Sequence, residues 1–145
     1  MKRPSIAVAS DHAGFYMKEL IFKHLIKEGY DVKDFGTYSD EAVDYPDFAH
    51  KLGFAIDNNE YELGFVFCGS GNGVNMAANK HQHVRSALCW TEEIAQLARA
   101  HNNANVCAIP ARFVSANDIL KIVAAFVNTQ FEGGRHEQRV AKIKI

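Results

Sequence analysis

The sequence has few of the residues that mark specialised classes of protein. It holds only three cysteines, Cys68, Cys89 and Cys107, and none of them forms a C-x-x-C pair. Isolated cysteines in odd number argue against a disulfide scaffold and a structural zinc site, and they favour a reduced, cytosolic location. No apolar run approaches the ~20 residues that span a bilayer. The first residues lead directly into a strand-like run, so we predict no signal peptide.

An excess of charge of either sign is also missing. The chain has 16 Lys and Arg against 17 Asp and Glu, a formal net charge of -1 at pH 7. Such a balance gives no general attraction to nucleic acid or to an anionic membrane, so an anion must be bound by a local cluster. With 48% hydrophobic and 23% charged residues in 145, the composition is that of one globular domain, residues 1–145.

Short apolar runs alternate with longer segments of helical periodicity from end to end. The runs of strand type are 5–9, 30–35, 63–68, 84–88 and 105–109, and a helical segment follows each of them. Five strands alternating with five helices predict an α/β fold: a three-layer, Rossmann-like, open parallel sheet with helices on both faces. Ligands of such sheets bind beyond the carboxyl ends of the strands, which points to 10–12, 68–73 and 110–112.

Residues 69–73 form a glycine-rich loop between a buried strand and a helix that we expect to begin near Val74. Three glycines let backbone N–H groups converge on an anion without obstruction by side chains. A dinucleotide fingerprint would need glycine at Val74, a phosphotyrosine-phosphatase loop would need arginine there, and a P-loop would need its lysine earlier than Lys80. The spacing therefore predicts a phosphate or a developing oxyanion as ligand; a plain tight turn is the alternative.

Cys68 ends the strand before this loop. Free cysteines are usually small buried hydrophobes, and we interpret Cys89 and Cys107 in that way. Cys68 differs because N–H dipoles beside it favour the thiolate, the form that accepts a proton. Composition alone leaves catalysis and a buried structural role equally open for it.

Three other polar residues lie near predicted strand or helix ends. Asp11 and His12 follow the first strand at the same sheet edge as Cys68, where either can also be a turn or helix-capping residue. His101 follows Ile94 and Leu97 at helical spacing, which predicts a position on an apolar helix face near its C-terminal end. A core histidine satisfied by a hydrogen bond is the alternative.

The last segment, 131–145, is too polar for the core and is predicted to be a tail. Arg135 and Arg139 are one helical turn apart and can offer a fork of donors to one phosphate. A solvated basic patch is the alternative. Of the seven histidines, only His81 and His83 have metal-type spacing, and no acidic residue is close to them in the sequence; we therefore predict no metal site.

Together these segments resemble the B-type ribose-5-phosphate isomerases and their galactose-6-phosphate isomerase relatives, through essentially the whole chain. The motifs that carry the resemblance are Ala9-Ser10-Asp11-His12-Ala13-Gly14, Asp44-Tyr45-Pro46, Cys68 to Gly73, Ala77-Ala78-Asn79-Lys80, His101-Asn102-Asn103-Ala104-Asn105, Arg112 and Gly133-Gly134-Arg135-His136. The resemblance implies an aldose–ketose isomerase that acts on a sugar phosphate through an enediol, with no metal or organic cofactor.

The resemblance also implies a role for each site residue. Cys68 matches the base that moves a proton between C2 and C1, and Ser70 matches a hydroxyl that assists proton movement between the substrate oxygens. His101, with Asp11, matches the group that opens the furanose ring. The implied contacts to the sugar and the enediolate are Tyr45, Gly69, Gly71, Asn72, Gly73 and Asn102. Those around the phosphate are His12, Arg112, Arg135, His136 and Arg139.

Relatives of this kind act as dimers or larger assemblies in which a neighbouring chain completes each site. This implies a homodimer or homotetramer, with 131–145 contacting a partner subunit. The implied reaction interconverts ribose 5-phosphate and ribulose 5-phosphate. Allose 6-phosphate and galactose 6-phosphate are alternatives because their chemistry at C1 and C2 is identical, although the galactose-6-phosphate enzymes divide the site residues between two different subunits. A non-catalytic phospho-ligand-binding module is a third hypothesis; a receiver domain would need aspartate at Cys68 and lysine at Pro110.

Overall fold

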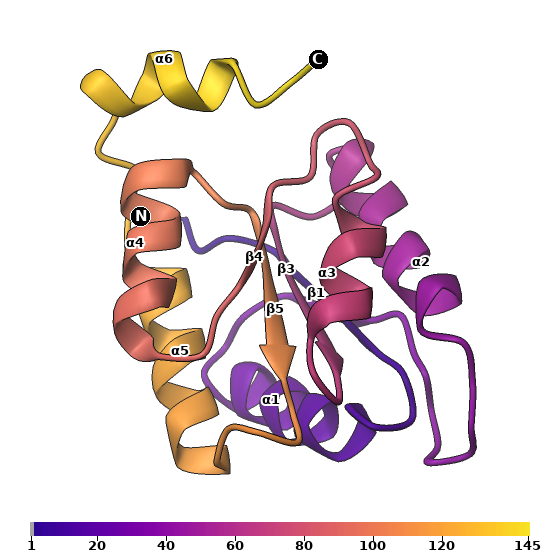
Figure 1. Cartoon of the computed structure of the whole chain (residues 1–145). Coiled ribbons are helices and arrows are strands. Elements are labelled where there is room, and N and C mark those ends of the chain that lie inside the picture. Colours follow the sequence, from indigo (N-terminus) through magenta and orange to yellow (C-terminus); the bar gives the residue numbers. More distant parts are fainter. Residues whose placement is uncertain (1) are drawn as a thin grey trace.

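The computed structural model describes residues 2–145, which form five strands and six helices (Figure 1). In chain order the elements are β1 (Ile6–Ser10), α1 (Phe15–Lys27), β2 (Val32–Asp34), α2 (Tyr45–Asp57), β3 (Leu63–Cys68), α3 (Asn72–Ala78), β4 (Ser86–Leu88), α4 (Glu92–Asn102), β5 (Val106–Pro110), α5 (Ala116–Asn128) and α6 (Arg135–Ala141).

The five strands form one parallel sheet in the order β2-β1-β3-β5-β4. Helices α2 and α3 pack on one face, while α1, α4 and α5 pack on the other. The predicted three-layer α/β fold is thus confirmed. From the neighbours β1 and β3 the chain leaves towards opposite edges of the sheet, and the crevice beyond their carboxyl ends is where such sheets bind ligands.

Strand β3 is buried along its whole length and packs against both helical layers. Phe65 and Phe67 lie in the core beneath α1, α4 and α5, whereas Val66 and Cys68 lie in the core beneath α2 and α3. Burial on both faces explains the continuous apolar run. Burying one large apolar side chain stabilises a fold by about 1.5–3 kcal/mol. The buried side chains of β3 therefore fix the position at which the following loop begins.

Several helix ends follow their local sequence signals. Thr91 Oγ1 accepts a hydrogen bond from the N–H of Ile94, and Ser115 Oγ accepts one from the N–H of Asp118, each at 3.2 Å. These side chains satisfy N–H groups that have no partner within the first helical turn. After the C-terminal end of α1, Gly29 takes φ +89, as glycine commonly does after a helix.

Two expectations about the helices are wrong. Residues 2–145 form six helices rather than five, because part of the polar segment after α5 folds into α6 with His136 buried. Helix α3 begins at Asn72 and not near Val74, because Gly71 takes φ +77 and turns the chain into the helix two residues earlier. Among residues 2–145, no helix combines the length and the apolar character needed to cross a membrane.

Candidate active site

The carboxyl ends of β1 and β3 bring the first group of predicted site residues together. The N–H of Asp11 donates to the carbonyl of Phe67 at 3.2 Å, so the segment after β1 is joined to the end of β3. The carboxylate of Asp11 accepts a hydrogen bond from the N–H of Gly14 at 3.0 Å and is buried. Asp11 therefore holds the turn into α1, as the structural alternative for this residue predicts.

His12 reaches this edge from the turn after β1, and Tyr45 from the first residue of α2. Nδ1 of His12 accepts a hydrogen bond from the N–H of Val43 at 3.2 Å. In the neutral ring the proton then resides on Nε2, which can donate to a ligand. A Cβ at Gly73 would lie 2.5 Å from the ring of Tyr45, so the ring is packed directly against the glycine loop. Only glycine at position 73 leaves room for this ring.

The glycine loop itself is closed on one side by Arg112. The N–H of Arg112 donates to the carbonyl of Gly69 at 3.0 Å, and a Cβ at Gly69 would lie 3.3 Å from Nη1 of Arg112. Ser70 Oγ accepts a hydrogen bond from the N–H of Asn72 at 3.2 Å, which leaves the hydroxyl proton of Ser70 free to donate. A guanidinium, a hydroxyl and loop N–H groups thus lie side by side, a set of donors suited to an anionic oxygen.

Cys68 lies at the base of this loop with 5% of its surface exposed. It is the cysteine at the ligand-binding edge, whereas Cys89 and Cys107 lie in the opposite core layer. Burial raises the pKa of the Cys107 thiol well above its ordinary value, and a hydrogen bond with Cys89 raises it further. Cys107 is therefore unsuited to act as a thiolate, which agrees with its interpretation as a buried hydrophobe.

The second group of predicted site residues lies at the other end of the sheet. His101 and Asn102 end α4 just before β5 begins, whereas Arg112 follows the end of β5. The five residues of β5 separate the two groups by at least about 13 Å along the strand. In Figure 1 the arrowhead of β5 marks the carboxyl edge at the bottom, and α6 lies beyond the opposite edge at the top. Within one chain, the site residues at the carboxyl edge and those at the amino edge therefore do not form a single site.

Helix α6 joins this second group through a pair of stacked histidines. The rings of His101 and His136 are 4.3 Å apart between centroids with an interplanar angle of 13°. Arg135 and Arg139 extend from the same short helix and are exposed. His101 shares its face of α4 with Ile94 and Leu97, as predicted, and this apolar face is only partly covered, because Ile94 is 44% and Leu97 39% exposed. The alternative of a core histidine is wrong, because the side chain of His101 is 37% exposed.

Three polar contacts are missing from the sequence prediction. Lys18 is fully buried, and its Nζ donates to both carboxylate oxygens of Asp34 (2.7 and 2.8 Å) and to the carbonyl of Thr37 (2.7 Å). Lys18 is three residues before buried Ile21 and seven before buried Leu25, which is the spacing of the buried face of α1. The charge of Lys18 argues against a buried position, so the spacing alone does not predict it.

The other two contacts are centred on Asp57 and on Glu132. The carboxylate of Asp57 pairs with Nδ1 of His81 at 3.5 Å and of His83 at 3.3 Å, so these histidines do have an acidic partner. Glu132 lies beside His101 and His136. Glu132 and His136 have the local spacing i, i+4, whereas no local spacing announces the contacts of Asp57 or that of Glu132 with His101.

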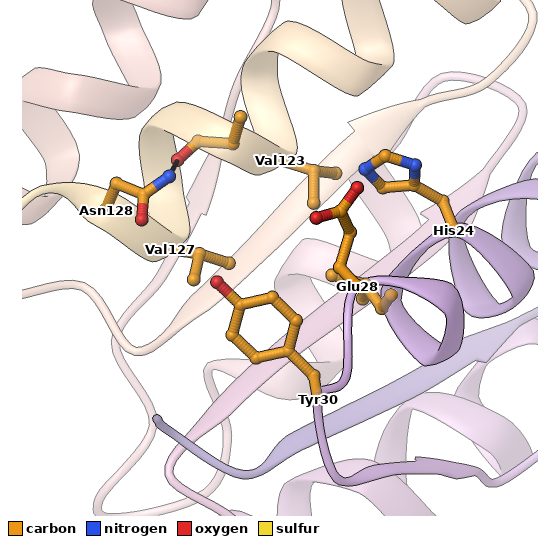
Figure 2. Close-up of a pocket in the computed structure, with 8 residues that line it drawn as sticks. His24, Glu28, Tyr30, Val123, Val127 and Asn128 are labelled. Atoms are coloured by element: carbon orange, nitrogen blue, oxygen red, sulfur yellow. Dashed lines mark hydrogen bonds between the residues drawn. The ribbon is translucent and has the colours of Figure 1, made fainter. Parts of the chain in front are cut away.

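Two hollows lie away from the glycine loop. A cleft of about 820 Å³ at the amino ends of the strands is lined by Asn102 and by several cationic side chains, among them Lys80, Arg85 and Lys144. A smaller hollow of about 230 Å³ between α1 and α5 is surrounded by His24, Glu28, Tyr30, Val123, Val127 and Asn128 (Figure 2). None of the predicted site residues lines the smaller one.

Comparison with known proteins agrees with these motifs. Residues 6–143 match the family model described as Ribose/Galactose Isomerase. The chain is 42% identical over 138 residues to ribose-5-phosphate isomerase B of Escherichia coli, covering 95% of this chain and 93% of that protein.

Solved structures give the same result. The crystal structure of a ribose 5-phosphate isomerase from Thermotoga maritima matches with a TM-score of 0.96 and 46% identity over 99% of each chain. Ribose-5-phosphate isomerase B from Mycoplasma genitalium, solved with bound ribulose-5-phosphate, matches with a TM-score of 0.92 and 45% identity over 96% of this chain and 93% of that one. The resemblance inferred from the motifs is confirmed: the chain belongs to the ribose/galactose isomerase family.

Proposed function

We propose that this chain is a type B ribose-5-phosphate isomerase, which interconverts ribose 5-phosphate and ribulose 5-phosphate. The observation that carries the proposal is the assembly around the glycine loop, where Cys68, the Ser70 hydroxyl and the Arg112 guanidinium lie together. The names of the relatives and the bound ribulose-5-phosphate of the Mycoplasma genitalium protein support it.

Cys68 is the proposed base of the reaction. Its thiolate takes the proton from C2 of the open-chain aldose, and the same proton or one from solvent then returns to C1. The electrons of the broken C–H bond form the enediolate, so the step needs no external oxidant or reductant. Loop N–H groups, such as that of Gly73 in the first turn of α3, have no partner within the helix and can stabilise the enediolate oxygen.

Ser70 and the residues around it complete the proposed chemistry at this edge. Because Ser70 Oγ already accepts a hydrogen bond from Asn72, its hydroxyl proton can be given to one substrate oxygen while the other is deprotonated. His12, Tyr45 and Arg112 are the proposed contacts to the sugar and the phosphate. Asp11 is proposed to assist ring opening in addition to holding the turn into α1.

A second copy of the chain is proposed to complete each site. His101, Asn102, Arg135, His136 and Arg139 would then come from the amino edge of the partner, where His101 opens the furanose ring and the arginines bind the phosphate. The exposed apolar side chains of Ile94 and Leu97 on the face of α4 that carries His101 support this contact. We therefore propose a homodimer or homotetramer in which 131–145 contacts the partner.

The substrate is tested by comparing kcat/KM for ribose 5-phosphate, allose 6-phosphate and galactose 6-phosphate on one metal-stripped preparation. We expect ribose 5-phosphate to be converted with the highest kcat/KM. A preference for a hexose phosphate would replace the proposed substrate within the same chemistry. Binding without conversion of any of the three would contradict the proposed function and favour a phospho-ligand-binding module. A cytoplasmic location is proposed with it, because Cys68 must stay reduced to act as a base.

A further inference from the structure

Glu132 lies beside two of the proposed site histidines, and the resemblance gives it no role. Its Oε1 is 3.9 Å from Nε2 of His101 and 3.5 Å from Nε2 of His136. These distances are within ion-pair range, and both rings turn the same nitrogen towards the carboxylate. The carboxylate thus lies at the common edge of the stacked pair.

The main chain places the backbone of Glu132 next to the last turn of α4. The N–H of Glu132 donates to the carbonyl of Ala100 at 3.0 Å, which ties the segment to the last turn of α4 directly before His101. Gly133 and Gly134 then take φ +69 and +56, values that residues with a side chain rarely adopt. This sharp turn precedes α6 and brings His136 back beside the carboxylate of Glu132, four residues earlier in the sequence. The backbone therefore brings residue 132 within reach of both histidines.

The three side chains also offer ligand atoms within 4.8 Å of one another, as a metal site would. The ring geometry favours a different use. The lone pair of an imidazole nitrogen lies in the ring plane, and the two planes are only 13° from parallel. A metal ion close to both Nε2 atoms would therefore lie well outside one plane or the other. A carboxylate that acts on the two rings through its charge, at 3.5 and 3.9 Å, does not need to lie in either ring plane.

We propose that Glu132 is a positioning residue for His101, an inference that rests on the proposed isomerase function. With its proton on Nε2 facing Glu132, neutral His101 keeps Nδ1 free as a base. Nδ1 takes the proton of the C1 hydroxyl, the C1–O4 bond breaks to leave the aldehyde, and the imidazolium returns the proton to O4. Glu132 faces the positive charge of the transient imidazolium, as the carboxylate of a catalytic triad does. Glu132 and His101 thus act together in ring opening and not in the later proton transfer between C2 and C1.

The experiment separates these two steps with Glu132→Gln. Ribulose 5-phosphate is an open chain, because the hydroxyl that would close a five-membered ring carries the phosphate. Exchange of its C1 hydrogen with deuterium from solvent therefore needs Cys68 but no ring opening. We expect Glu132→Gln to lower kcat/KM for conversion of ribose 5-phosphate by about tenfold or more, while the exchange rate stays near that of the native chain. The matched control is Glu137→Gln in helix α6, which should leave both rates unchanged.

Every other outcome overturns the role of Glu132. Unchanged conversion would show that the carboxylate is dispensable, and an equal loss of conversion and exchange would show a general structural defect, which thermal denaturation of the variant would reveal. Loss of native activity on chelation, with recovery on added Zn²⁺, would make Glu132 a metal ligand instead. Failure of the proposed function has a separate signature, because the native chain would then neither convert ribose 5-phosphate nor exchange the C1 hydrogen of ribulose 5-phosphate.

Discussion

At the scale of single residues, the surroundings of the three cysteines differ more than their burial does. Cys68 ends β3 directly before the glycine loop, in which Gly69 lies against Arg112, whereas Cys89 and Cys107 contact each other in the apolar layer under α4 and α5. A thiolate is stabilised by nearby N–H groups and positive charge, and it is destabilised by apolar surroundings. We therefore propose Cys68 as the residue that transfers the proton.

Substitution of Cys68 by alanine tests this assignment. Without a base at C2, kcat for ribulose 5-phosphate formation should fall by about 100-fold or more, while the free energy of unfolding changes little. The matched control is Cys89→Ala, which removes a buried thiol far from the loop and should keep kcat near the native value. Near-normal turnover by Cys68→Ala would mean that another group is the base.

The buried thiol of Cys107 predicts a pH dependence of stability. Burial, and then the hydrogen bond with Cys89, raise its pKa above the ordinary value of 9.0 in the folded chain. Above that pH the unfolded chain loses this proton and the folded chain keeps it, so the free energy of unfolding should fall as pH rises, by at most about 1.4 kcal/mol per pH unit for this group. Urea unfolding between pH 8 and 10 should show a shallower decline for Cys107→Ala; an identical decline would exclude Cys107 as the cause.

At the scale of elements, α6 is the part of the chain whose position has the largest functional consequence. It lies against the C-terminal end of α4, carries Arg135 and Arg139, and stacks His136 on His101. No acidic side chain pairs with either arginine among residues 2–145, so both guanidinium groups can meet an external phosphate. The helix is proposed to deliver these groups to the site of a partner subunit.

Substitution of Arg135 or Arg139 by alanine tests whether these side chains bind the phosphate. Loss of one charge-assisted hydrogen bond to phosphate should raise KM by about tenfold or more with a smaller change in kcat. Lys142→Ala removes a cation from the end of the same helix and is the matched control, for which KM should not change. Native kinetics in both arginine variants would place the phosphate elsewhere.

The sequence predicts the elements better than their contacts. Strands β1, β3 and β5 are predictable because they are buried on both faces and therefore continuously apolar. Helix α6 escapes prediction because two glycines precede it and its exposed face is polar. The pairing of Glu132 with His101 depends on how α4 and α6 meet in space, and a single sequence carries no local signal of that contact.

At the scale of the whole molecule, the proposed site residues fall into two groups at opposite edges of one sheet. Cys68 and the glycine loop occupy the carboxyl edge, and His101 with the α6 arginines occupies the amino edge. Symmetric association of two identical chains would bring the carboxyl edge of each to the amino edge of the other and form two complete sites. The isolated chain would hold two half-sites.

Mixing two inactive variants is the most direct test of this shared site. Cys68→Ala and His101→Ala each remove one half of the chemistry, and a mixed dimer would hold one site with both native residues and one site with neither. Equal amounts of the two variants, unfolded and refolded together, should therefore recover about a quarter of native turnover per chain. A mixture that stays as inactive as its components, although subunit exchange is demonstrated with two affinity tags, would contradict a site shared between subunits.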